Sequence, residues 1–146
     1  MSQPLYDTDF YTWTQEQAEA LRTKNLAALD LDHLAEEIED VGNSVRFALE
    51  SHLVRLLLHL LKLAYGPSAR PQRGWQVTVA NAREEIAKRA TGALHRHPAA
   101  YLPDAYRQAR RNAVLALDRP LVDFPETCPW PIERVLDEDF FPEPEQ

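Results

Sequence analysis

The side chains best suited to chemistry in this sequence are Glu37, His52 and His59, spaced along one predicted helix, and Arg83 on the next. Carboxylates, histidines and arginines are the groups that transfer protons, bind metal ions or hold phosphates. His52 and His59 lie about 10 Å apart along a helix axis, too far for one zinc ion with bonds of roughly 2.0–2.1 Å. We therefore group the four as a candidate polar site, expect no metal there, and predict that His59 is a core histidine satisfied by hydrogen bonds.

Two further patterns keep an enzyme as an alternative. An arginine and a histidine separated by four to six intervening residues are the signature of helical-bundle toxin nucleases, and Arg46 with His52 and Arg89 with His95 both fit it. Chance alone gives roughly 1.3 such pairs in this composition, so the two matches carry little information. The acidic run from Glu36 to Asp40 suits a hard cation. It also opens a predicted helix, where negative charge complements the helix dipole, and we favour that interpretation over a metal-dependent enzyme.

A basic stripe on a later predicted helix forms a candidate interaction surface. Arg107, Arg110 and Arg111 lie opposite the alanine-rich face of this helix, which must point to the core. We predict that the three guanidinium groups face solvent and are available to a partner.

Charge and cysteine content exclude several classes of protein. The net charge is −7, which argues against a dedicated nucleic-acid binder. Residues 62–119 nevertheless hold eleven basic and four acidic side chains. Nucleic-acid binding through this basic segment is an alternative, whereas mutual neutralisation between helices is the interpretation we favour.

The compartment is expected to be the cytoplasm. One cysteine, Cys128, excludes an internal disulfide framework and a cysteine-only zinc site within one chain. The first ten residues have no export signal, and the apolar runs are far too short to span a membrane. The sequence has no phosphate-binding glycine loop and no nucleotide fingerprint, so we expect no cofactor.

The elements that position these residues are helices throughout. Apolar residues recur at helical spacing over about 9–24, 31–65, 74–95, 103–117 and 131–137. We expect one domain over residues 1–146. The predicted fold is all-α: an antiparallel bundle of four main helices with one long central helix and a short docked C-terminal helix.

The long central helix depends on how Gly42 is interpreted. The apolar phase that includes Ile38, Val41 and Val45 continues through Gly42 without a shift, so one helix of about 35 residues, roughly 50 Å long, is predicted. Gly42 is then interpreted as a close-packing point. Because the other helices are shorter, we expect uncovered apolar surface on this helix and a homodimer that covers it.

Several motifs together resemble the bacterial family catalogued as domain of unknown function 29. The segments that carry this resemblance are Tyr6–Trp13, Leu34–Asp40 with Gly42, Leu58–Lys62, Trp75 with Arg83, and Phe124–Trp130. The resemblance implies an all-α bacterial protein and carries no established activity. It leaves the function open, and the missing catalytic signals are what favour a non-catalytic helical interaction module with a protein partner.

Overall fold

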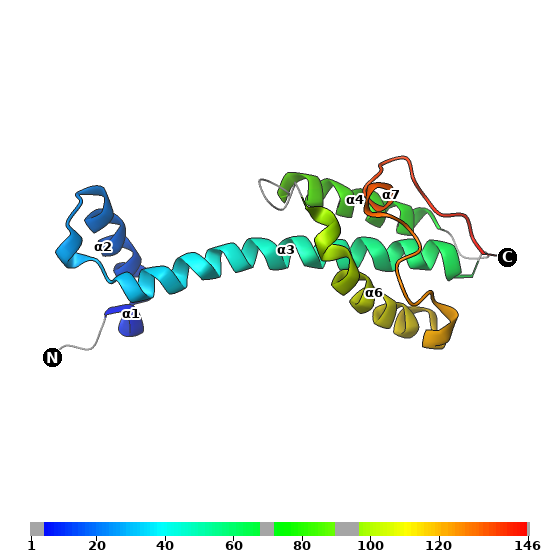
Figure 1. Ribbon diagram of the computed structural model, residues 1–146, viewed down its shortest axis with the longest axis horizontal. Coiled ribbons are helices and arrows are strands. Elements are labelled where there is room, and N and C mark those ends of the chain that lie inside the picture. Colours follow the sequence, from blue (N-terminus) through cyan, green and yellow to red (C-terminus); the bar gives the residue numbers. More distant parts are fainter. Residues whose placement is uncertain (1–4, 68–71, 90–96, 146) are drawn as a thin grey trace. The chain divides into compact units, whose positions relative to one another are not determined.

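A computed structural model describes residues 5–67, 72–89 and 97–145, and these contain helices and connecting segments without a strand. The α-helices are α1 (Leu5–Thr8), α2 (Phe10–Arg22), α3 (Leu31–Tyr65), α4 (Arg73–Arg89), α6 (Leu102–Leu117) and α7 (Ile132–Val135) (Figure 1). Short 3-10 turns cover Leu26–Ala28, Pro98–Tyr101 and Leu121–Asp123. The prediction of an all-α bundle with one long helix is confirmed. The predicted end of the third helix at residue 95, and with it His95, lies outside the described residues.

The chain divides into two compact units, Met1–Ser44 and Val45–Gln146. We expected one domain, and the two units share a single uninterrupted element, α3, which has the bounds predicted for the long helix. Whether both units fold together as one domain stays a prediction.

The first unit is held by polar contacts around α2. Asp9 caps this helix by accepting a hydrogen bond from the Thr12 amide at 3.1 Å. Gln17 is buried, and its side chain donates to the Ala28 carbonyl at 3.1 Å and accepts from the Asp30 amide at 2.7 Å. One glutamine side chain thereby fixes the loop between α2 and α3.

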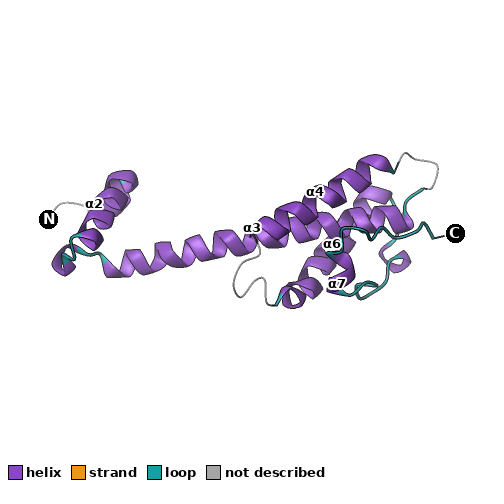
Figure 2. Cartoon of the chain, turned by 90° about the horizontal axis from the view of Figure 1, so that it is seen from above, coloured by secondary structure: helices purple, strands orange, loops and turns teal. Residues whose placement is uncertain are grey.

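The second unit is built on an apolar core. The core combines the C-terminal half of α3 with α4, α6 and α7. α4 runs alongside α3 in both views (Figures 1 and 2). Leu56, Leu57, Leu60 and Leu61 of α3 are fully buried, as are Val79 of α4 and Ala109 of α6. The residues that α2 buries, Trp13, Gln17 and Ala20, lie in the first unit.

Gly66 ends α3 at a point where only glycine fits. A Cβ at this position would stand 2.4 Å from the Lys62 carbonyl oxygen and 3.0 Å from the Trp75 ring. Because real Cβ atoms do not approach backbone so closely, the glycine allows Trp75 at the start of α4 to pack beside the end of α3.

The C-terminal segment docks on the second unit, as predicted. Tyr106 donates its hydroxyl hydrogen to the Pro125 carbonyl at 2.6 Å, and Arg83 donates from Nε to the Val135 carbonyl at 2.8 Å. Near the end of the chain the Glu145 amide donates to the Ala64 carbonyl at 2.8 Å. These three bonds fix the segment after α6 at widely separated points.

Candidate interaction surfaces

The four residues of the candidate polar site have separate partners. Glu37 belongs to the first unit, where its carboxylate accepts from the Tyr6 hydroxyl at 2.5 Å. This hydrogen bond, followed by desolvation, raises the pKa of Tyr6 to about 12. His52 is half-buried on α3 in the second unit. No hydrogen bond or ion pair joins any two of the four side chains, all of which the structure describes.

His59 and Arg83 each bond to backbone. His59 is half-buried, and its Nδ1 lies 2.8 Å from the Arg55 carbonyl oxygen one turn earlier in α3. Burial is the main reason why the pKa of His59 is lowered. Arg83 is buried, bonds to Val135 and lies 5.4 Å from the Phe141 ring, so it holds the C-terminal segment in place.

The residues considered for metal binding or RNA cleavage show no assembled site. Across the described ranges, no three histidine, cysteine or carboxylate side chains lie close enough together to hold a metal ion. Arg46, from one arginine–histidine pair, is engaged with Glu50 at 3.0 Å. In the other pair Arg89 is engaged with Glu85, and His95 lies outside the described residues.

Sequence reasoning missed an aromatic and polar cluster in the first unit. His33 Nδ1 lies 2.6 Å from Asp30 Oδ2, and the Trp13 indole donates to the same oxygen at 3.2 Å. The Tyr6 ring stacks on His33 with centroids 3.8 Å apart. The hydrogen bond between His33 and Asp30 raises the pKa of the His33 imidazole and lowers the pKa of the Asp30 carboxyl. In the sequence, an aspartate three residues before a histidine at a helix start indicates only a helix cap. Tyr6 and Trp13 belong to one of the motifs of the family resemblance, but nothing in that motif predicts their contact with His33 or Asp30.

The predicted arginine stripe lines a real pocket. Arg107, Arg110 and Arg111 of α6 face the 121–128 segment across a pocket of about 620 Å³. Arg107 and Arg111 are exposed, and Arg110 is half-buried. Cys128 also lines this pocket, and burial raises the pKa of its thiol, which donates to the Trp130 carbonyl. Burial therefore favours the neutral thiol over the thiolate.

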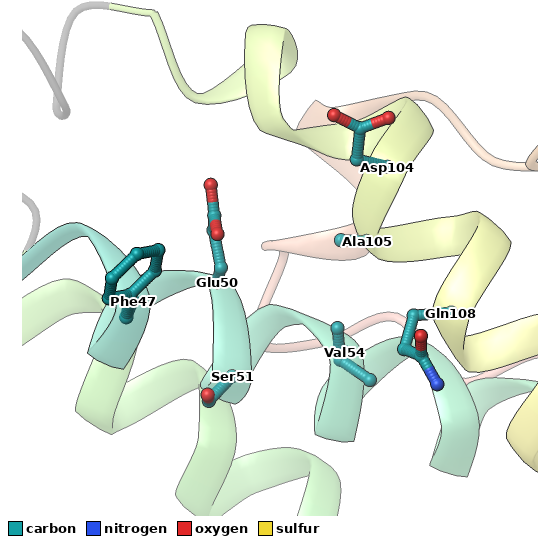
Figure 3. A pocket seen from close by; sticks show the side chains of 7 residues that line it. All are labelled: Phe47, Glu50, Ser51, Val54, Asp104, Ala105 and Gln108. Atoms are coloured by element: carbon teal, nitrogen blue, oxygen red, sulfur yellow. The ribbon is translucent and has the colours of Figure 1, made fainter. Parts of the chain in front are cut away.

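A second pocket, of about 520 Å³, lies between α3 and α6 in the second unit. Figure 3 shows its floor and walls: Phe47, Glu50, Ser51 and Val54 come from α3, and Asp104, Ala105 and Gln108 come from α6. Glu50 and Asp104 give it a negative rim. On α3 the lining of this pocket begins at Phe47, which is also the last residue of an exposed stretch over residues 38–47.

Residues 38–47 of α3 form an exposed stretch of helix. Every residue from 38 to 47 is exposed. In the first unit Ile38 and Val41 are 70% and 67% exposed, and in the second unit Phe47 is 60% exposed. A Cβ on Gly42 would meet no atom within 4 Å. The close packing predicted for Gly42 is therefore wrong for the described residues.

Fold and surfaces define the class of this protein: an all-α bundle protein with surface pockets on its second unit and a stretch of exposed apolar side chains on α3. The chain belongs to the family described as domain of unknown function DUF29, whose model matches residues 5–141. Neither the curated proteins nor the solved structures include a significant match to the chain. Among the described helices, none has the length and hydropathy needed to cross a bilayer.

Proposed function

We propose that the protein is a non-catalytic helical interaction module whose partner is a second copy of the same chain, bound along residues 38–47 of α3. The observation that carries this proposal is the exposure of Ile38, Val41, Val45 and Phe47 on one stretch of helix. Large apolar side chains grouped on a monomer surface favour association, because burying them removes apolar area from water.

The apolar residues of this stretch have the spacing of a coiled-coil seam. Leu34, Ile38, Val41, Val45 and Ala48 alternate at intervals of four and three residues. Such a seam presents one narrow stripe to a partner helix, with each side chain inserted between those of the facing helix. Gly42 flanks the stripe, and with nothing near its Cβ position it permits a second backbone to approach closely.

Charge favours an antiparallel pair. Four carboxylates lie between residues 36 and 40, whereas Arg46 and Glu50 balance each other in the following turn. A parallel pair would set four carboxylates against four. In an antiparallel pair with Ile38 opposite Ala48 of the second copy, the acidic turn faces the neutral one, and the exposed residues cover one another. The interface is then symmetric, as expected for a two-fold dimer.

The first test is the mass of the protein in solution. Sedimentation equilibrium at micromolar concentration should give a dimer for the wild type and a monomer for Val41→Glu, because two buried glutamates would enter the seam. Leu115→Glu, which changes an 84% exposed leucine on α6, is the matched control and should stay dimeric. A monomeric wild type would overturn the proposal.

A second test distinguishes the two orientations. In a Cys128→Ser background, the double variant Ile38→Cys/Ala48→Cys should form an intermolecular disulfide under oxidation, because the two positions face each other in the antiparallel pair. Ile38→Cys alone should not, since the two copies of residue 38 would be about 15 Å apart along the axis, beyond the reach of a disulfide. Efficient cross-linking of Ile38→Cys alone would indicate a parallel pair.

The basic segment 62–119 supports the choice of an interaction module over a nucleic-acid binder. Arg83 is buried against Val135, Arg89 pairs with Glu85, and Arg119 pairs with Asp123. Much of the positive charge is thereby engaged within the chain. We place the module in the bacterial cytoplasm, since the family resemblance implies a bacterial protein and the free Cys128 fits a reducing compartment.

A further inference from the structure

The arginine-lined pocket on α6 is independent of the α3 surface. It lies wholly in the second unit, between α6 and the 121–128 segment. Its volume of about 620 Å³ falls within the range of small-molecule sites. Three of its lining side chains are arginines, and Glu126 is its one carboxylate, so the lining has a net positive charge.

Arg110 is held in place and retains an unused donor. Its Nη2 donates to the Phe124 carbonyl at 2.9 Å and to the Leu121 carbonyl at 3.1 Å, which fixes the guanidinium against the far wall. Its Nε is buried and has no hydrogen-bond partner among the described residues. A buried N–H without an acceptor is costly. Because this Nε is shielded from solvent, an anion in the pocket is attracted by the charge of the fixed guanidinium and not by a direct hydrogen bond to Nε.

The other two arginines are free to turn toward a ligand. Arg111 is exposed and makes no hydrogen bond or ion pair within the described ranges. Arg107 pairs with Asp104 at 3.1 Å, but both side chains are mostly exposed, so this ion pair is weak and easily exchanged. Two mobile guanidinium groups beside a fixed one suit an anion with several oxygens.

The apolar side chains of the pocket indicate that the anion is attached to an organic group. Leu102, Pro103 and Leu121 line the pocket beside the arginines. We propose that this pocket binds a small organic phosphate, with its phosphate oxygens on Arg107, Arg110 and Arg111 and its organic part against the apolar wall. A phosphate is preferred to a single carboxylate because the positive charge of three arginines exceeds what one carboxylate and Glu126 would neutralise.

The test uses inorganic phosphate and phenyl phosphate as probes, with acetate for comparison, at constant ionic strength. The Nε–H resonance of Arg110 in a proton–nitrogen correlation spectrum should shift saturably with both phosphates. Phenyl phosphate should bind more tightly than inorganic phosphate, because its ring covers the apolar wall. Arg111→Gln and Arg107→Gln should each weaken phenyl phosphate binding by about tenfold, the value of one charge-assisted hydrogen bond.

The matched control is Arg73→Gln, which removes one exposed positive charge from the start of α4 and should leave the affinity unchanged. Arg110 is left intact in all variants, because it also anchors the 121–124 segment. Absence of a saturable shift up to roughly 10 mM phosphate, or an equal loss of affinity in Arg73→Gln, would overturn the proposal. Acetate binding as tight as phosphate would overturn the choice of phosphate.

Discussion

The two units of this chain are stabilised by different chemistry. The first unit relies on polar and aromatic contacts, with Gln17 and Asp30 bonded to backbone, indole and imidazole groups. The second unit relies on fully buried leucines of α3 packed on α4, α6 and α7. A small unit has too little interior to bury much apolar surface, so hydrogen bonds must supply the stability that apolar burial does not provide. The larger unit has enough interior for apolar burial to supply most of its stability.

The largest effect is expected from truncating the apolar core. Leu60→Ala should lower the free energy of unfolding of the second unit by about 2–5 kcal/mol, because Leu60 is completely buried and its removal leaves a cavity. Urea denaturation followed by circular dichroism measures the change. Leu115→Ala makes the same chemical change at an exposed position of α6 and should cost less than about 0.5 kcal/mol. Equal effects would mean that the core is not where the structure places it.

A smaller, local effect is expected in the first unit. Gln17→Leu keeps the volume of the side chain but leaves the Ala28 carbonyl and the Asp30 amide without their partner, which should cost about 1–3 kcal/mol. Hydrogen exchange over residues 10–22 measures this as faster local opening, with the second unit unaffected. Gln15→Leu, at an exposed position of the same helix, is the control. Unchanged exchange in Gln17→Leu would show that apolar contacts hold this unit after all.

The smallest effect contrasts one histidine from each unit. The pKa of His33 is raised by its hydrogen bond to Asp30, so the folded first unit binds its proton more tightly than the unfolded chain. Its stabilising contribution is complete below the ordinary histidine pKa of 6.5 and is lost as the pH rises through the raised value. The pKa of His59 is lowered, mainly by burial, so its contribution has the opposite sign: it is complete above 6.5 and is lost as the pH falls through the lowered value.

Proton NMR titration of the two imidazole rings measures this contrast directly. His33 should titrate above the ordinary value and His59 below it. Asp30→Asn should return His33 toward 6.5 without moving His59. The contrast between the units fails if both rings titrate together or if Asp30→Asn moves both.

The sequence predicts the helices well and their partners poorly. The unbroken apolar phase through Gly42 predicted the bounds of α3, because periodicity is a local property of the chain. On α6, Arg107 and Arg111 are exposed opposite the buried alanines, whereas Arg110 is half-buried and bonded to the Leu121 and Phe124 carbonyls, a contact that helical spacing does not encode. The contact between Tyr6 and Glu37 joins residues 31 positions apart, and no local pattern encodes such a pairing. Periodicity likewise identifies the apolar face of α2 without naming what covers it, so the place of α2 relative to the other long helices stays a prediction.

The exposed part of α3 stays helical for a reason that lies outside it. An isolated helix of ten residues is marginal in water, because nucleation costs more entropy than its first hydrogen bonds return. Here the turns on either side are fixed by Glu37 in the first unit and by Leu49 in the second, so nucleation is already complete at both ends. Residues 38–47 need only propagate a helix that exists. A helix laid along this stretch would bury its exposed side chains and so suppress local opening there as it binds.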